Sequence, residues 1–314
     1  MLAYTLKRLL AGLVTVFFIA TATFAAMHAV PGDPLMSGKA RSAEIRRNLR
    51  VRYGLDKPVL VQYGVFLGNM AKGDFGISFT QQNRSVNDII REHFKVSAVL
   101  GLVALAFATA GGILLGAVTA RFRGRLADRS ILFLVVLGIS VPSFVFAALG
   151  QQVVLALNRW AGTTVLPVAG WGTVRHLLLP ALALGLGTLA FLTRLMRSSL
   201  LEVVHQDWVR TARAKGLPPW RIFWSHQLRN AILPVVTLLG PALAAITTGG
   251  FVVESVFAIP GLGRYFVQAV QQLDYTVIMG LTVFYGAFLA FMVIVVDILY
   301  GFVDPRIRVA KEAA

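Results

Sequence analysis

The sequence predicts an all-α, polytopic membrane protein with six transmembrane helices. Its composition indicates this class, because 57% of the 314 residues are hydrophobic and only 14% are charged. The apolar residues also gather in long runs, and about 20 apolar residues in a helix cross a hydrocarbon core of about 30 Å. Ordinary soluble domains have a more polar composition. We therefore expect a single transmembrane domain over residues 1–314.

The first apolar run follows Lys7 and Arg8 and extends over Leu9–Val30. A signal peptide also places basic residues before an apolar run, but its apolar core is shorter, and here more runs follow. We interpret this run as an uncleaved first span with a cytoplasmic N-terminus. The other expected spans are Val96–Ala120, Ile131–Leu157, Leu177–Met196, Val235–Val256 and Val277–Val303.

Two prolines and a glycine pair lie inside these spans. Pro142 and Pro241 are predicted to kink or locally break their helices, because proline removes a backbone donor and clashes with the preceding turn. Gly112 and Gly116 form a GxxxG pattern, which favours close packing against another helix. Ordinary glycines in a membrane helix would give the same pattern, so both interpretations stay open at this point.

A polar region over residues 31–95 follows the first span. It opens with a turn at Pro31–Pro34, and Ser42 can cap a short helix that ends at Gly54. Pro58 suits the first turn of a second short helix with apolar positions that could face the membrane. We expect an extracytoplasmic loop region that contains short helices.

The basic residues of the short connections predict the topology. They gather between spans two and three and between spans four and five, so both connections and both termini are expected in the cytoplasm. The loop over residues 198–234 is then cytoplasmic. Anionic headgroups and this topology explain the net charge of +16, so no nucleic-acid partner is expected. The basic residues that carry the argument are Arg121, Arg123, Arg125, Arg129, Arg194, Arg197, Arg210, Arg213, Lys215, Arg221 and Arg229.

The chain carries no recognisable catalytic motif. It has no G-x-x-x-x-G-K-[ST] phosphate loop, so it is not expected to hydrolyse ATP, and it has no H-E-x-x-H zinc motif. It also has no nucleophile elbow. It has no cysteine, and its five histidines are scattered. We predict no catalytic residue, no metal site and no cofactor in this chain. The histidines are His28, His93, His176, His205 and His226.

Two acidic residues fall at or near span depth. Asp297 lies in the last span and is expected to pair with Arg121 or Arg194 near the cytosolic face, although intramembrane acids are also functional candidates. Glu254 lies near the outer end of the fifth span. So little intramembrane charge argues against a proton- or sodium-coupled transporter. A membrane-embedded enzyme lacks a set of catalytic side chains.

The segment over residues 207–234 is basic and longer than a simple turn requires. Residues 207–215 are predicted to form a short helix with a small-residue face, and Gly216 is predicted to cap its C-terminal end. Asp207 suits the positive N-terminal end of that helix, and Lys215 suits its negative C-terminal end. Small side chains allow a partner surface to approach closely.

This segment resembles the coupling loop of ABC importer permeases. RTARAKGL followed by LRNAILPVVT is similar to the form found in oligopeptide and dipeptide permeases. Ala212, Gly216 and Leu233–Pro234 match the general pattern Glu-Ala-Ala-x-x-x-Gly followed by Ile-x-Leu-Pro. The sequence departs from that pattern at the positions of Glu, the first Ala and Ile. The gap between Gly216 and Leu233–Pro234 is also longer than in the pattern. The departing residues are Arg210, Thr211 and Ala231.

Three further stretches carry the same resemblance, which extends over nearly the whole chain. They are PGDP…YGLDKPVLVQY…GDFGISF…SVNDII in the first loop, FVVESVFAIPGLG after the fifth span, and DYTVIMGLTVFYGAF…VVDILYGFVDPRIR at the end. The best match is the first of the two permease subunits of oligopeptide importers. By this resemblance, Glu254 would shape the outer vestibule or the binding-protein contact, unless it makes a structural pair.

The resemblance implies the type I ABC importer permease fold in a bacterial cell membrane. It implies a second homologous permease subunit, two cytosolic ATP-binding subunits that hold ATP and Mg²⁺, and an extracytoplasmic peptide-binding protein. The expected solute is an oligopeptide or dipeptide; glutathione, nickel chelates and antimicrobial peptides stay open, and the sequence identifies no substrate-binding residue. The residues expected to couple to the ATPase are Asp207, Arg210, Thr211, Ala212, Arg213, Ala214, Lys215 and Gly216. Among these, Ala212 and Gly216 would make the tight contact, with Arg213 and Lys215 as polar anchors.

Overall fold

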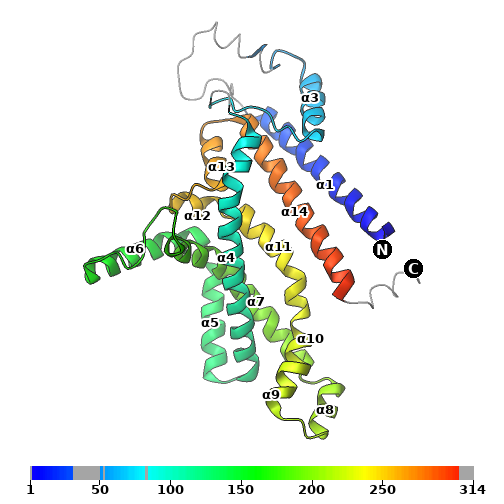
Figure 1. Cartoon of the computed structure of the whole chain (residues 1–314), viewed down its shortest axis with the longest axis vertical. Coiled ribbons are helices and arrows are strands. Elements are labelled where there is room, and N and C mark those ends of the chain that lie inside the picture. The colour runs from blue at the N-terminus through cyan, green and yellow to red at the C-terminus, as the bar shows by residue number, and fades with distance from the viewer. Residues whose placement is uncertain (1, 31–49, 52–53, 82–83, 304–314) are drawn as a thin grey trace. The chain divides into compact units, whose positions relative to one another are not determined.

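The computed structural model describes residues 2–30, 50–51, 54–81 and 84–303. Every named element in these ranges is a helix, and an isolated antiparallel bridge joins Ile77 to Ser85. The turn expected at Pro31–Pro34 and most of the helix expected after Ser42 lie outside the described residues. The helices (Figure 1) are α1 Leu2–Ala29, α3 Val59–Ala71, α4 Val86–Arg121, α5 Leu126–Ser140, α6 Ser143–Ala161, α7 Val174–Val203, α8 Asp207–Ala214, α9 Pro219–Ile222, the π-helix η1 Phe223–Leu228, α10 Arg229–Ala231, α11 Leu233–Gly249, α12 Phe251–Val256, α13 Leu262–Gln271 and α14 Tyr275–Val303.

Four single helices in the described residues are long and apolar enough to cross a membrane: α1, α4, α7 and α14. Two bent pairs of helices raise the number of candidate spans to six. One pair is α5 with α6, and the other joins residues 219–231 to α11. The expected all-helical membrane fold is therefore confirmed.

The chain forms two compact units. The flanking unit comprises residues 1–97 and 260–294, and the central unit comprises residues 98–259 and 295–314. Helix α4 begins in the flanking unit and continues into the central unit. It starts at Val86, so the last part of the expected 31–95 loop is already helical.

The break predicted at Pro142 is confirmed, because the run expected over Ile131–Leu157 is divided there into α5 and α6. Helices α5 and α6 meet there at an angle of 107°, which Figure 1 shows as a sharp turn of the chain. Proline supplies no N–H to the carbonyl four residues back and forces the residue before it out of the helical region. Val141 is accordingly extended, with ψ of 126°.

A kink or a local break was predicted at Pro241. The break is wrong, because α11 continues through that residue, and the kink stays a prediction. A bend of 46° lies earlier, at the step from Ala231 to Leu233. The helix of the fifth span also ends earlier than expected. It was predicted to extend to Val256, but α11 stops at Gly249 and the short helix α12 follows.

Helix α7 is the most buried of the four long helices and forms the core of the central unit. Its residues Leu192 and Met196 pack with Val235 of α11 in one apolar cluster. The close packing predicted for Gly112 and Gly116 is confirmed. A Cβ atom at either glycine would lie 2.7 Å or less from the Cβ of the α7 residue that faces it, so only glycine allows this approach.

The flanking unit joins α1, α3, α13 and most of α14. Asp274, just before α14, anchors the loop between α3 and α4. Its carboxylate accepts hydrogen bonds from the Ser78 hydroxyl at 2.5 Å and from the Thr80 hydroxyl at 2.7 Å. The backbone N–H groups of Phe79 and Thr80 also donate to it, each at 3.1 Å. A buried carboxylate needs such donors to replace water, so this loop and the start of α14 are held together.

Candidate functional site

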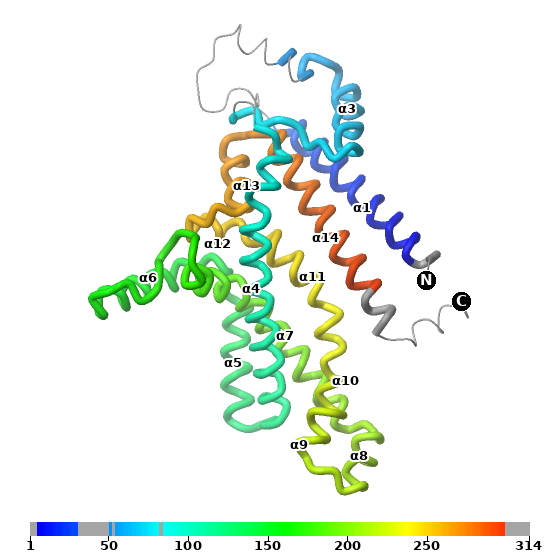
Figure 2. The backbone as a smooth tube through the Cα atoms, in the orientation of Figure 1, coloured from blue at the N-terminus to red at the C-terminus, as the bar shows by residue number. Residues whose placement is uncertain are grey.

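The short helix predicted over residues 207–215 is present as α8, Asp207–Ala214. Figure 2 follows the chain from the end of α7 into α8 and back through α9 towards α11. Gly216 has a φ of +72°, and its N–H donates to the Arg213 carbonyl at 2.9 Å. The Leu217 N–H donates to the Ala212 carbonyl at 3.3 Å. These paired bonds form the Schellman motif, which closes a helix at a left-handed residue, so the predicted glycine cap is confirmed.

One face of α8 packs inside the chain. Val209 and Ala212, three residues apart, are buried against Ile222 of α9, with Val203 and Leu217 at the edge of the cluster. Residues three apart share a helix face. Ala212 therefore helps to hold α8 on the chain, and its burial argues against the tight contact with a partner that we predicted for it.

The opposite face of α8 is exposed and basic. The exposed candidates are Asp207, Arg210, Thr211, Arg213, Ala214, Lys215 and Gly216. Arg210 lies 3.5 Å from the Asp207 carboxylate, but both side chains are solvent-exposed, so the pair orients the side chains and adds little stability. The exposed face combines small residues with positive charge, and this combination suits close contact with an acidic partner surface.

Short and mostly helical connections link α8 to α7 and to α11. The segment α9, η1 and α10 continues without a gap, and Gln227 of the π-helix η1 is buried. π-Helical turns are rare in proteins, and those that occur are often found at functional sites. Upstream, α7 ends at Val203, only a short turn before α8. A displacement of α8 would thus be transmitted to both α7 and α11.

A buried ion pair lies in the central unit near the α4–α5 turn. Arg197 of α7 donates from Nε and Nη2 to the two carboxylate oxygens of Asp128, each at 2.9 Å. The backbone N–H of Gly124 donates to the same carboxylate at 2.9 Å. The Asp128 side chain is 4% exposed and that of Arg197 is 24% exposed. The sequence reasoning missed this pair, although Asp128 is the one acid among the arginines of that turn.

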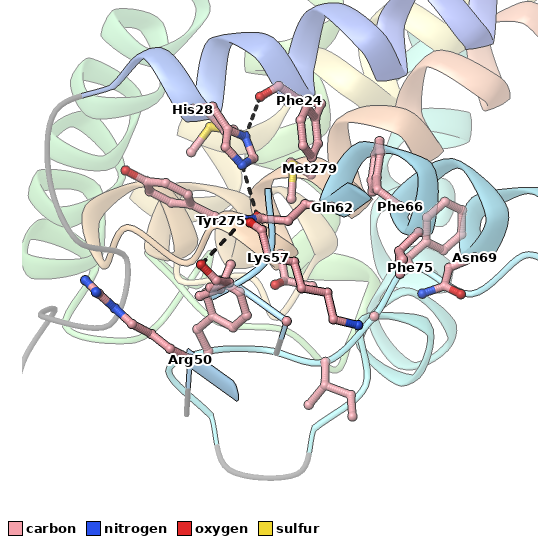
Figure 3. A pocket seen from close by; sticks show the side chains of 18 of the residues that line it. Phe24, His28, Arg50, Lys57, Gln62, Phe66, Asn69, Phe75, Tyr275 and Met279 are labelled. Carbon is pink, nitrogen blue, oxygen red and sulfur yellow. Dashed lines mark hydrogen bonds between the residues drawn. The ribbon is translucent and has the colours of Figure 1, made fainter. Parts of the chain in front are cut away.

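The flanking unit contains a large cavity at the end of α1, with a volume of about 800 Å³. Figure 3 shows how Phe24 and His28 of α1 lie beside Gln62 and Phe66 of α3. Gln62 connects the two helices, because its Oε1 lies 3.3 Å from His28 Nε2. Its amide nitrogen also donates to the carbonyl of Lys57, just before α3, at 2.8 Å. The sequence indicated no cavity here.

A smaller cavity of about 350 Å³ lies in the central unit at the break between α5 and α6. It is bounded by α5, α6, α7 and α11, and Pro142, Gly187 and Thr188 are among the residues that line it. The sequence predicted a break at Pro142, and the cavity lies at this break. The sequence did not indicate which helices surround the cavity.

The two predicted intramembrane acids have different surroundings. Glu254 of α12 is buried, with 1% exposure, which favours its structural role over a direct contact with a binding protein. Asp297 lies in α14, and its pairing with Arg121 or Arg194 stays a prediction. Within the described part of the chain, no group of three or more His, Asp or Glu side chains is placed to hold a metal ion.

The described helices include four to six candidate membrane spans, and the exposed basic helix α8 lies between two of them in the chain. The chain belongs to the family described as the binding-protein-dependent transport system inner membrane component, whose model matches residues 112–309. The model of the N-terminal part of such membrane components matches residues 1–101. The chain is thus a multi-pass membrane protein of a transport-permease family and not a catalytic subunit.

Full-length relatives place the chain more closely within this family. It is 42% identical to the dipeptide transport system permease protein DppB of Bacillus subtilis (strain 168), over 99% of this chain and all of that protein. It is 41% identical to the oligopeptide transport system permease protein OppB of Haemophilus influenzae, over 98% of this chain and all of that protein. The predicted family resemblance is therefore confirmed.

A solved structure shows the same fold. The inward-facing MetNI methionine ABC transporter matches with a TM-score of 0.52 and 18% identity, over 68% of this chain and 94% of that chain. Since the identity is low, this likeness concerns the fold alone.

Proposed function

We propose that this chain is one of two permease subunits in an ATP-driven importer of dipeptides or oligopeptides. The relatives named as dipeptide and oligopeptide permeases support this solute class, because they match over their whole length. In this proposal the chain forms half of the translocation pathway, and a second homologous permease subunit forms the other half. An extracytoplasmic binding protein delivers the peptide.

The observation that carries the proposal is the exposed basic face of α8. Within the part of the chain that the structure describes, this face is exposed, whereas Val209 and Ala212 hold the other face against α9. We assign it to contact with one of two cytosolic ATP-binding subunits. ATP and Mg²⁺ would bind those subunits, since this chain has no phosphate loop.

Coupling follows from the short connections of α8 to α7 and to α9. When ATP closes the two ATPase subunits, each carries a permease helix such as α8 with it, and the attached helices follow as rigid bodies. The pathway then changes from inward-open to outward-open. This orientation requires α8 and both termini to be cytoplasmic, as the arginine-rich connections favour.

Reconstitution in liposomes tests the proposal. The permease pair with its ATPase subunits and binding protein should take up peptide when ATP is supplied, and not when a non-hydrolysable analogue replaces it. The permease pair alone should be inactive under a proton or sodium gradient. Uptake driven by such a gradient without the ATPase subunits would contradict the proposal. Uptake of glutathione or a nickel chelate in place of peptide would retain the ATP-driven mechanism and reject the solute class.

A further inference from the structure

Counting residues along the expected apolar runs assigns the cavity at the break between α5 and α6 to the middle of a bilayer. Pro142, Gly187 and Ala245 all line it and come from three different apolar runs. Each lies about ten residues from the start of its run, which corresponds to about 15 Å of helix, half of a hydrocarbon core of about 30 Å. Broken helices at this depth occur where the backbone lines a cavity, and in transporters they mark substrate sites.

The break leaves backbone groups at the cavity without helical partners. Pro142 has no N–H, so the Gly138 carbonyl lacks the donor that a continuous helix would supply. At the other side of the break α6 begins, and the N–H of Ser143 belongs to the first helical turn, where no intrahelical acceptor exists. The Pro142 carbonyl accepts from Val145 at 3.0 Å. Both Gly138 and Ser143 line the cavity.

The walls of the cavity are small and uncharged. Gly138, Gly187 and Gly249 contribute bare backbone, Ser143 and Thr188 contribute hydroxyl groups, and none of the described residues that line it is ionisable. A Cβ atom at Gly187 would have the Gly138 carbonyl oxygen as its nearest neighbour, at 4.0 Å, and one at Gly249 would meet nothing within 4 Å. Space beside these two glycines is therefore open and not filled by packing.

We infer that this cavity binds the backbone of the transported peptide, an inference that rests on the proposed function. A peptide group carries an N–H that can donate to the Gly138 carbonyl and a C=O that can accept from the Ser143 N–H. Hydrogen bonds to the backbone are independent of the peptide's side chains, and an uncharged wall neither repels nor selects charged side chains. The volume of about 350 Å³ is at the lower end of ligand pockets, about 300–1,000 Å³, and accommodates a segment of a peptide.

Other occupants match this chemistry less well. A lipid acyl chain or an apolar helix of the second permease subunit would cover the Gly138 carbonyl without donating to it, and burying an unpaired polar group is unfavourable. A peptide backbone supplies donors and acceptors in alternation. The side chains could extend into the half of the pathway that the second subunit would form.

A graded substitution series tests the site in the reconstituted complex. A Cβ atom fits at Gly187 without a clash, so Gly187→Ala, Gly187→Val and Gly187→Leu should fill the cavity stepwise. Peptide uptake should fall with side-chain size, at least tenfold for leucine. Binding-protein-stimulated ATP hydrolysis should continue in all three variants. The matched control is Gly64→Leu in α3, because a Cβ atom at Gly64 has nothing within 4 Å and Gly64 does not line this cavity. Its uptake should stay within twofold of wild type, and wild-type uptake by Gly187→Leu would overturn the inference.

Photocrosslinking identifies the occupant directly. Benzoylphenylalanine at position 187 should attach to a radiolabelled tripeptide during turnover, whereas the same group at position 64 should not. Attachment of position 187 to the second permease subunit or to lipid alone would overturn the inference. The proposed function fails by a different result, namely wild-type complexes that take up no peptide, so the two failures are distinguishable.

Discussion

Arg197 of α7 holds the carboxylate of Asp128 in α5 with two parallel hydrogen bonds, each 2.9 Å long. Two parallel N–H···O bonds make this the geometrically specific form of an arginine–carboxylate pair. The Gly124 N–H adds a third bond, so the α4–α5 turn is fixed to the part of α7 that leads to α8. Motion of α8 would therefore reach α5 as well as α7.

Removing one partner of this pair should destabilise the protein strongly. Arg197→Met leaves the Asp128 carboxylate buried with one backbone donor, and breaking a buried pair costs about 3–5 kcal/mol. Asp128→Asn should cost less, because the Arg197 side chain is 24% exposed and can reach solvent. Thermal unfolding of the detergent-purified permease pair measures both changes.

Two further variants at these positions are controls. Arg197→Lys keeps the charge but loses the two-pronged geometry, so its melting temperature should fall between wild type and Arg197→Met. The double variant Arg197→Met/Asp128→Asn should regain part of the lost stability, because no buried charge remains unpaired. Additive losses in the double variant would show that the two residues act independently.

Gly116 should tolerate no side chain. A Cβ there would lie 2.6 Å from Met196 Cβ and 2.8 Å from the Thr193 carbonyl oxygen, so Gly116→Ala should force α4 and α7 apart and cost about 1–3 kcal/mol. Gly64→Ala in α3 is the matched control, with open space around it. It should leave the melting temperature unchanged or raise it, since alanine favours helix. Equal effects of the two substitutions would argue against the α4–α7 packing.

Gly216→Val should prevent coupling without preventing membrane insertion. A β-branched residue at a φ of +72° is strained by about 1–2 kcal/mol, so the Schellman motif that ends α8 should open. ATP-driven uptake should fall to background and the ATPase subunits should no longer co-purify. Gly162→Val is the matched control, because Gly162 caps α6 with a φ of +65° and open space around it. Loss of ATPase binding in both variants would indicate a general folding defect.

Local chemistry made much of this structure predictable from the sequence. Gly216 ends α8 as expected, because a glycine cap depends only on neighbouring backbone groups. Pro142 breaks its run for the same kind of reason. The angle of 107° at that break was not predictable, since it depends on how α6 packs against other helices. Pro241 shows the converse, because its helix continues through the residue.

The missed features depend on residues far apart in the sequence. Asp128 and Arg197 are brought together only by the packing of α5 on α7. The inward face of α8 was missed because Ala212 was assigned to a partner, although Val209 three residues earlier already indicated an apolar stripe. Asp274 and its donors Ser78 and Thr80 meet through the fold of the flanking unit.

The measurement that tests the account most directly is cysteine crosslinking from α8 to the ATPase subunits. The chain has no native cysteine, so Thr211→Cys and Ala214→Cys each place a single thiol on the exposed face. Ala212→Cys is the matched control on the buried face, where exposure is 5%. The account predicts crosslinks to an ATP-binding subunit from positions 211 and 214 and none from position 212. Crosslinks to that subunit from the α4–α5 turn at Gly124→Cys, with none from α8, would contradict it.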